Sequence, residues 1–199
     1  HTREKIEIPF PGEIQVYNRL LPTMPPEWYK PYEETVRGVP PMPAIGSGYR
    51  FHVTGLTHDH MGFPTSRPDE VKAATERIFR KIDRFFHDIQ IVDHDLTEDA
   101  DTLVIAYGCV ARSARLAVRQ AREAGVRAGL LSLKTLFPFP RSHVEKLLRT
   151  CKLVLVPEMN MGQLSREVKR VNCGITTIRT LNRVDGQIIT PSQILKEIA

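Results

Sequence analysis

The sequence has few cysteines, and they lie far apart. Cys109, Cys151 and Cys173 are the three cysteines among 199 residues, and no two of them form a C-x-x-C pair. This spacing argues against a disulfide framework, a zinc site and an iron–sulfur cluster held by the chain itself. We therefore predict no metal site on this sequence.

Long apolar runs are absent as well. No stretch reaches the roughly eighteen consecutive apolar residues that a membrane helix requires, and the first residues are polar where a signal peptide would be apolar. The net charge of +5 is mild, and no basic run alternates with aromatic residues. These features predict a cytoplasmic protein that binds neither membrane nor nucleic acid.

Prolines are concentrated in residues 1–65, where neither helical nor strand periodicity persists. A disordered linker would be poor in aromatic residues, yet Trp28, Tyr29, Tyr32 and other aromatic residues recur through this segment. We predict that residues 1–65 form an extended arm that packs on a surface, either of this chain or outside it.

A long amphipathic helix is expected after the arm. Apolar residues recur at intervals of three and four from Val71 to Ile89, and Ser66 and Asp69 are spaced as a capping box around Pro68. We assign residues 66–100 to this helix and the connection that follows it.

Residues 101–199 alternate between strand-like and helix-like stretches. Four apolar runs, "TLVIAYG", "AGLLSL", "KLVLVP" and "TTIRTL", are each followed by a helical pattern. Ser142 with Glu145, and Thr190 with Gln193, are spaced as capping boxes for two of these helices. Apolar strands joined by helices predict an α/β domain whose parallel sheet is covered on both faces.

Ligands and partners of parallel sheets gather at the carboxyl ends of the strands. Gly108 and Cys109 follow the first strand, where helix amides could receive an anion, although a tight strand-to-helix turn explains one glycine better. Phe137 and Phe139 lie in an apolar loop after the second strand, which either caps the core or contacts another subunit.

The loop after the third strand is the most distinctive. Glu158, Asn160, Gly162 and Gln163 follow one another between a strand and a helix. A carboxylate and an asparagine at this position can stabilise the helix N-terminus, so loop stabilisation and contact with a partner are both open.

Two further patterns have simple explanations. His52, His58, Asp59 and His60 are close in sequence, but their spacing fits no standard zinc motif, which favours a loop. Arginines at positions 112, 115, 119 and 122 line one helix face, which is typical of a solvated surface or of a docking stripe for an acidic partner.

Several of these stretches resemble one known family. The T-G-x-x-H-D stretch at 54–59, "KTLFPFP" at 134–140 and P-E-M-N-x-G-Q at 157–163 are similar to the C-terminal half of the alpha subunit of 2-oxoacid:ferredoxin oxidoreductases, most closely the 2-oxoglutarate type. The resemblance covers essentially the whole chain. It departs at His60, where many relatives are expected to carry a glutamate.

The resemblance implies a domain like the C-terminal domain of transketolase, within a complex that uses thiamine diphosphate, magnesium, iron–sulfur clusters, coenzyme A and ferredoxin. It also implies a beta subunit as partner and an oligomeric assembly. The pyrimidine-binding domain is expected outside this sequence, so this fragment should hold no cofactor and no catalytic residue. Glu158, Asn160, Gly162, Gln163, Phe137 and Phe139 are then expected to contact a neighbouring domain or subunit.

Two other functions stay open at this point. One is a free-standing α/β module that binds a nucleotide at Gly108, although such a module would not need the aromatic arm. The other is the C-terminal domain of a different thiamine enzyme, such as a transketolase or the beta chain of a 2-oxoacid dehydrogenase. The choice between 2-oxoglutarate and a branched 2-oxoacid also stays open.

Overall fold

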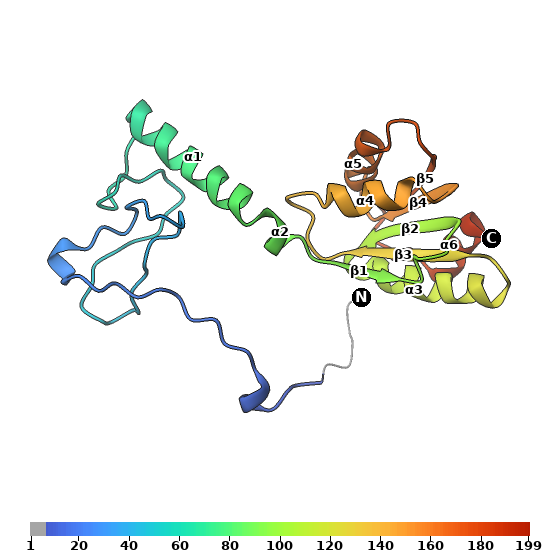
Figure 1. The fold of residues 1–199 in the computed structure, drawn as a ribbon, viewed down its shortest axis with the longest axis horizontal. Helices are drawn as coiled ribbons and strands as arrows, with labels where there is room; N and C mark the ends of the chain where they lie inside the picture. The colour runs from blue at the N-terminus through green and yellow to red at the C-terminus, as the bar shows by residue number, and fades with distance from the viewer. Residues whose placement is uncertain (1–6) are drawn as a thin grey trace. The chain divides into compact units, whose positions relative to one another are not determined.

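The computed structural model describes residues 7–199, which divide into two compact units (Figure 1). One unit comprises residues 7–86 and the other residues 87–199. No helix within residues 7–199 is long and apolar enough to cross a membrane.

The second unit contains the predicted α/β domain. Its five-stranded sheet has the order β1-β3-β2-β4-β5. The strands are β1 (Val92–Asp95), β2 (Thr102–Tyr107), β3 (Ala128–Leu133), β4 (Leu153–Glu158) and β5 (Thr177–Asn182), and the helices are α3 (Gly108–Glu123), α4 (Arg141–Leu148), α5 (Gln163–Asn172) and α6 (Pro191–Ile198). Strands β2 to β5 are parallel, and each is followed by a helix, which confirms the predicted alternation.

Strand β1 was not predicted. Its four residues, "VDHD", pair antiparallel with β3, although they lie in the segment that the sequence assigns to a connection. Two aspartates and a histidine give this strand no apolar pattern, so only its pairing with β3 identifies it.

Helices cover both faces of the sheet, as expected. Helices α4 and α5 lie on one face, and α3 and α6 lie on the other (Figure 1). Neighbouring strand residues point to opposite faces, so Val154 and Val156 join the core beneath α4 and α5 while Leu155 joins the core beneath α3 and α6. Two hydrophobic cores therefore hold the sheet between two helix layers.

The unit of residues 7–86 is mostly irregular chain, as predicted. It contains two short 3₁₀ turns, η1 (Pro11–Glu13) and η2 (Pro26–Trp28), and the long helix α1 (Pro68–Arg84), while α2 (Phe86–Ile89) follows at the junction with the other unit. Within residues 7–86, the buried apolar side chains are few: Tyr29, Pro31 and Pro43. Tyr29 and Tyr49 pack edge to face, whereas Tyr17 and Trp28 are 83% and 74% exposed.

Arginines of α1 hold the arm to this helix. The Arg77 guanidinium donates to the Tyr32 carbonyl oxygen at 2.9 Å, and Arg80 pairs with Glu34 at 2.8 Å. The guanidinium of Arg84 donates to the carbonyl oxygen of Val36. Polar contacts therefore replace much of the apolar packing that a folded unit normally has.

Two of the three predicted capping boxes are wrong. Helix α1 begins at Pro68, so Arg67 precedes it and no side chain caps it. Helix α4 begins directly after Pro140, which places Ser142 inside its first turn, and Glu145 pairs instead with Arg141. The third box is confirmed, because the Thr190 side chain accepts from the Gln193 amide and the Gln193 side chain accepts from the Thr190 amide.

Candidate functional site

The carboxyl ends of four parallel strands share one edge of the sheet. All the contact and anion-site residues that the sequence predicts lie where β2, β3 and β4 end, in the loops there or at the starts of the helices that follow. Because β2 lies between β3 and β4, these three loops are neighbours in space.

Glu158 ends β4 and is completely buried, with 0% of its surface exposed. Its carboxylate oxygens accept hydrogen bonds from the amides of Leu164 at 2.8 Å and Ser165 at 3.0 Å, in the first turn of α5. These amides have no partner within a helix, so the carboxylate supplies both the bonds and a favourable charge at the helix N-terminus. Complete burial favours loop stabilisation over the predicted contact with a partner.

Asn160 joins three strand ends. Its side-chain oxygen accepts from the amides of Gly162 at 2.8 Å and Gln163 at 3.0 Å, as a capping side chain does. Its side-chain nitrogen donates to the Tyr107 hydroxyl at the end of β2, and its carbonyl oxygen accepts from the side chain of Asn182 at the end of β5. The asparagine therefore fixes the loop against β2 and β5.

Gly162 makes this compact loop geometry accessible. Its φ of +91° lies in the left-handed region, and a Cβ there would lie 3.0 Å from the Ser165 hydroxyl oxygen. A side chain at position 162 would therefore be strained and would crowd Ser165. Gly162 is thus a backbone residue of the loop and presents no contact group.

A small cavity of about 180 Å³ opens beside this loop. It is lined mainly by apolar side chains and by two polar ones from α5: Tyr107, Leu136, Phe139, Gln163, Leu164 and Glu167. Tyr107 and Leu136 escaped the sequence analysis, because a tyrosine that ends an apolar strand and a leucine in an apolar loop show no separate pattern.

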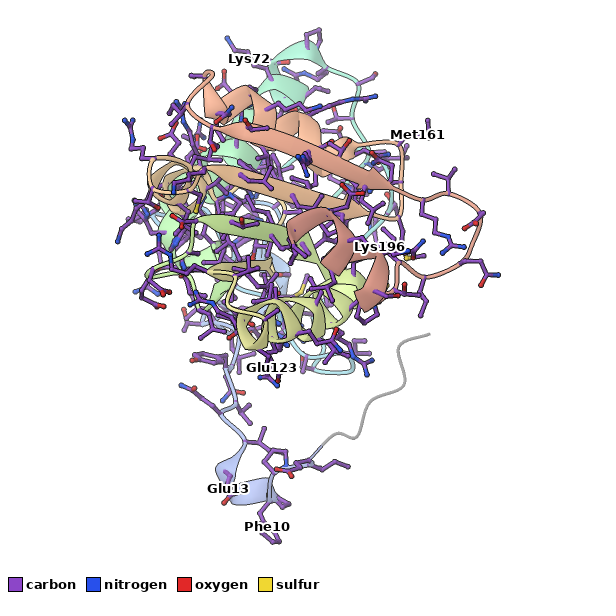
Figure 2. All side chains as sticks on the ribbon, turned by 90° about the vertical axis from the view of Figure 1, so that its right-hand side faces the viewer. Phe10, Glu13, Lys72, Glu123, Met161 and Lys196 are labelled. Carbon is purple, nitrogen blue, oxygen red and sulfur yellow. The ribbon has the colours of Figure 1, made fainter. Side chains whose placement is uncertain are left out.

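Large apolar side chains are exposed on the same loops, including Leu136, which is 43% exposed. Phe137 is 73% exposed and Met161 is 70% exposed. Met161 projects into solvent from the loop that ends β4 (Figure 2). Phe139, by contrast, is half-buried and packs against the core. The strand ends therefore combine a rigid polar loop, a small apolar cavity and exposed apolar side chains.

Gly108 and Cys109 form the predicted strand-to-helix turn. Gly108 has a φ of +56° and begins α3, and the Cys109 thiol lies 3.8 Å from the sulfur of Met159. No charged side chain is bound to either residue among the contacts of the described chain. Anion binding here stays a prediction.

The T-G-x-x-H-D stretch forms an internally bonded turn in the other unit. His58 is buried, stacks on Tyr32 with ring centres 4.7 Å apart, and lies 2.9 Å from the Thr54 hydroxyl. Asp59 accepts from the amides of Met61 and Phe63. Within residues 7–199, no three histidine, cysteine or acidic side chains are arranged to hold a metal ion.

The arginine face of α3 is partly occupied by ion pairs. Arg115 pairs with Asp95 at 3.2 Å, and Arg122 pairs with Asp99 at 2.6 Å. The hydrogen bond from Arg122 holds the pKa of Asp99 below its usual value. These pairs favour the solvated face over the docking stripe.

Comparisons with known proteins agree with this architecture. Residues 100–194 match the family model of the pyruvate:ferredoxin oxidoreductase core domain II. The matched residues make up most of the α/β unit.

The whole chain has close relatives. It is 43% identical over 199 residues to the 2-oxoglutarate synthase subunit KorA of Methanothermobacter thermautotrophicus, of which it covers 52%. It is 34% identical over 198 residues to the subunit of the same name from Methanocaldococcus jannaschii. The solved 2-oxoglutarate:ferredoxin oxidoreductase from Magnetococcus marinus, with 2-oxoglutarate, coenzyme A and succinyl-CoA bound, aligns with 97% of this chain and 34% of its own, at 26% identity and a TM-score of 0.77.

The chain belongs to the family of alpha subunits of 2-oxoacid:ferredoxin oxidoreductases, which confirms the resemblance that its motifs carry. It spans about half the length of the curated relatives it matches.

Proposed function

We propose that the chain is part of the alpha subunit of an enzyme that oxidises 2-oxoglutarate and reduces ferredoxin, leaving the acyl group on coenzyme A. The supporting observation is the match along the whole chain to 2-oxoglutarate synthase subunits, at 43% and 40% identity in two Methanothermobacter relatives. The ketoisovalerate oxidoreductase subunit VorB of Methanothermobacter marburgensis matches only 52% of the chain, at 35% identity. This difference favours 2-oxoglutarate over a branched 2-oxoacid.

Within that enzyme, we propose that the α/β unit works in assembly and binds no cofactor itself. Activation of thiamine diphosphate requires a carboxylate that can reach the cofactor, and both oxygens of Glu158 already accept backbone hydrogen bonds inside the domain. The strand-end residues therefore do not fit a thiamine site. Thiamine diphosphate, magnesium and the iron–sulfur clusters would be held by other parts of the complex, in the cytoplasm.

The proposed contact surface is the apolar part of the strand ends. Phe137, Met161 and Gln163 are exposed there, beside the cavity lined by Leu136 and Phe139. Exposed aromatic and methionine side chains next to a small apolar cavity are typical of the anchoring part of an interface. Glu158, Asn160 and Gly162 hold the loop in shape for this contact and do not make it. The partner is a neighbouring domain or the beta subunit of the oxidoreductase.

The first experiment tests the reaction. The complete alpha subunit, produced with its beta subunit, should reduce ferredoxin with 2-oxoglutarate and coenzyme A, and should do so more slowly with 3-methyl-2-oxobutanoate. Residues 1–199 alone should show no thiamine diphosphate binding by calorimetry. Faster reduction with the branched acid would contradict the proposed substrate. Thiamine diphosphate binding to residues 1–199 would contradict the proposal that this part of the subunit binds no cofactor.

The second experiment tests the contact surface. Phe137→Ser in the complete alpha subunit should weaken association with the beta subunit or with the rest of the subunit, because it removes an exposed aromatic anchor. Leu116→Ser is the matched control, since Leu116 is 48% exposed on α3, away from the strand-end loops. Equal subunit affinity of the Phe137 variant, the Leu116 variant and the parent would exclude the strand ends as the contact surface.

A further inference from the structure

The outer edge of β5 is open. Within residues 7–199, β5 pairs with β4 alone and ends the sheet. The Arg183 amide, one residue beyond β5, donates to the carbonyl oxygen of Glu158, so odd-numbered residues direct their backbone groups towards β4. The amides and carbonyls of Ile178, Thr180 and Asn182 therefore face outward, because successive residues of a strand alternate in direction.

The two edges of this sheet differ in how they are protected. The opposite edge strand, β1, has four residues, and its Asp93 and Asp95 pair with Lys134 and Arg115. Short strands and charges of this kind discourage pairing with another chain. Strand β5 has six residues with no proline or glycine, and its one charged side chain, Arg179, donates to the Glu197 carbonyl oxygen on α6 at 3.2 Å. Strand β5 thus lacks the usual protection.

We propose that β5 pairs with β5 of a second copy of this chain, antiparallel, about a twofold axis at Thr180. In this register Thr180 faces Thr180 of the second copy, and Ile178 faces its Asn182. All three outward-facing residues then form hydrogen-bonded pairs, which gives about six backbone hydrogen bonds between the copies. Arg179 faces Leu181 of the second copy, so the two arginines do not oppose each other.

The residues at the two ends of β5 support a second copy as the occupant. Ile175, just before the strand, is 44% exposed, and Val184, just after it, is 65% exposed. Antiparallel pairing brings the start of one β5 next to the end of the other, so each Ile175 approaches Val184 of the second copy. The same patch is used twice, which closes the assembly at two copies and leaves no open β5 edge.

A charge exchange at Thr180 tests both the surface and the register, because only a residue at the twofold axis faces itself. The Thr180 side chain is exposed, so substitution should leave the fold intact, and circular dichroism melts of each variant check this. Thr180→Lys alone and Thr180→Glu alone should each raise the dimer dissociation constant at least about tenfold, because like charges meet. A mixture of the two variants should form a mixed dimer.

Sedimentation equilibrium of the 199-residue chain and of both variants, over a wide concentration range, measures these constants. A parent dimer that is lost in each single variant and restored in the mixture would support the proposal. A parent chain that is monomeric throughout would overturn it. Dimers that persist in both single variants would also overturn it, since the copies would then associate through another surface.

Discussion

Replacing Glu158 by alanine is the most direct test of how the strand-end loop is held. The side chain is fully buried, and its two oxygens accept the amides of Leu164 and Ser165. Alanine removes both acceptors and leaves two donors of α5 without partners. The sequence alone predicts a small loss of stability, because it does not show that this carboxylate is inside the protein.

The size of the effect follows from those two amides. A buried donor left without a partner costs about 1–3 kcal/mol, and loss of a helix cap costs about 0.5–2 kcal/mol when the end of the helix can fray and reach water. Fraying of α5 would limit the loss, so Glu158→Ala should lower the free energy of unfolding by about 2–4 kcal/mol. Glu158→Gln should cost less, because one oxygen remains as an acceptor.

Urea denaturation of the chain, followed by circular dichroism, measures this loss. Glu167→Ala is the matched control: Glu167 lies on the same helix, its side chain is 45% exposed, and it pairs with Arg170. An exposed pair of this kind is worth about 0–1 kcal/mol, so this variant should stay close to the parent. A loss for Glu158→Ala no larger than that of the control would show that the carboxylate does not hold the helix end.

Three further outcomes are expected. Gly162→Ala should lower the free energy of unfolding by about 1–3 kcal/mol, because the left-handed φ strains any side chain and the new Cβ meets Ser165. The melting temperature should fall accordingly, and an unchanged melting temperature would contradict this. The hydrogen bond from Arg183 lowers the pKa of Asp185 to about 2. The difference in melting temperature between the parent and Asp185→Asn should therefore persist from neutral pH down to about pH 4 and disappear as the pH falls towards 2. A difference that grows in acid would refute the pairing. Hydrogen exchange of the isolated chain should be faster in the arm unit than in the α/β unit, and equal protection would show that the arm is stable by itself.

The α/β unit could be predicted from sequence because its signals are local and redundant. Strands β2, β3 and β4 are buried on both faces and read as continuous apolar runs, and each precedes a helix with its own apolar stripe. Strand β1 could not be predicted, because a strand of "VDHD" is defined by its partner β3 and not by its composition. The two wrong capping boxes misplace the start of the helix, because the residue before α1 is Arg67 and not Ser66, and the residue before α4 is Pro140 and not Ser142.

For the candidate site, the sequence indicates where the residues lie in the fold but not what each of them does. The sequence shows that Glu158, Asn160 and Gly162 end a strand and begin a helix, and the topology then brings them to one edge of the sheet with Phe137. Their roles depend on burial and, for Asn160, on a bond to Tyr107, which no spacing reveals. Buried capping residues and exposed apolar residues are interleaved in the loop, so position in the sequence cannot separate them.

This interleaving has a physical basis. An interface loop that orders only on binding must lose conformational entropy at that moment, which weakens the association. Here the bonds of Glu158 and Asn160 hold the loop in one shape before any partner arrives, while Met161, the residue after Asn160, stays 70% exposed. The polar residues therefore stabilise the fold, and the apolar residue beside them is presented in a fixed position. Affinity at this surface should depend on both groups, but only loss of the polar residues should also unfold the end of α5.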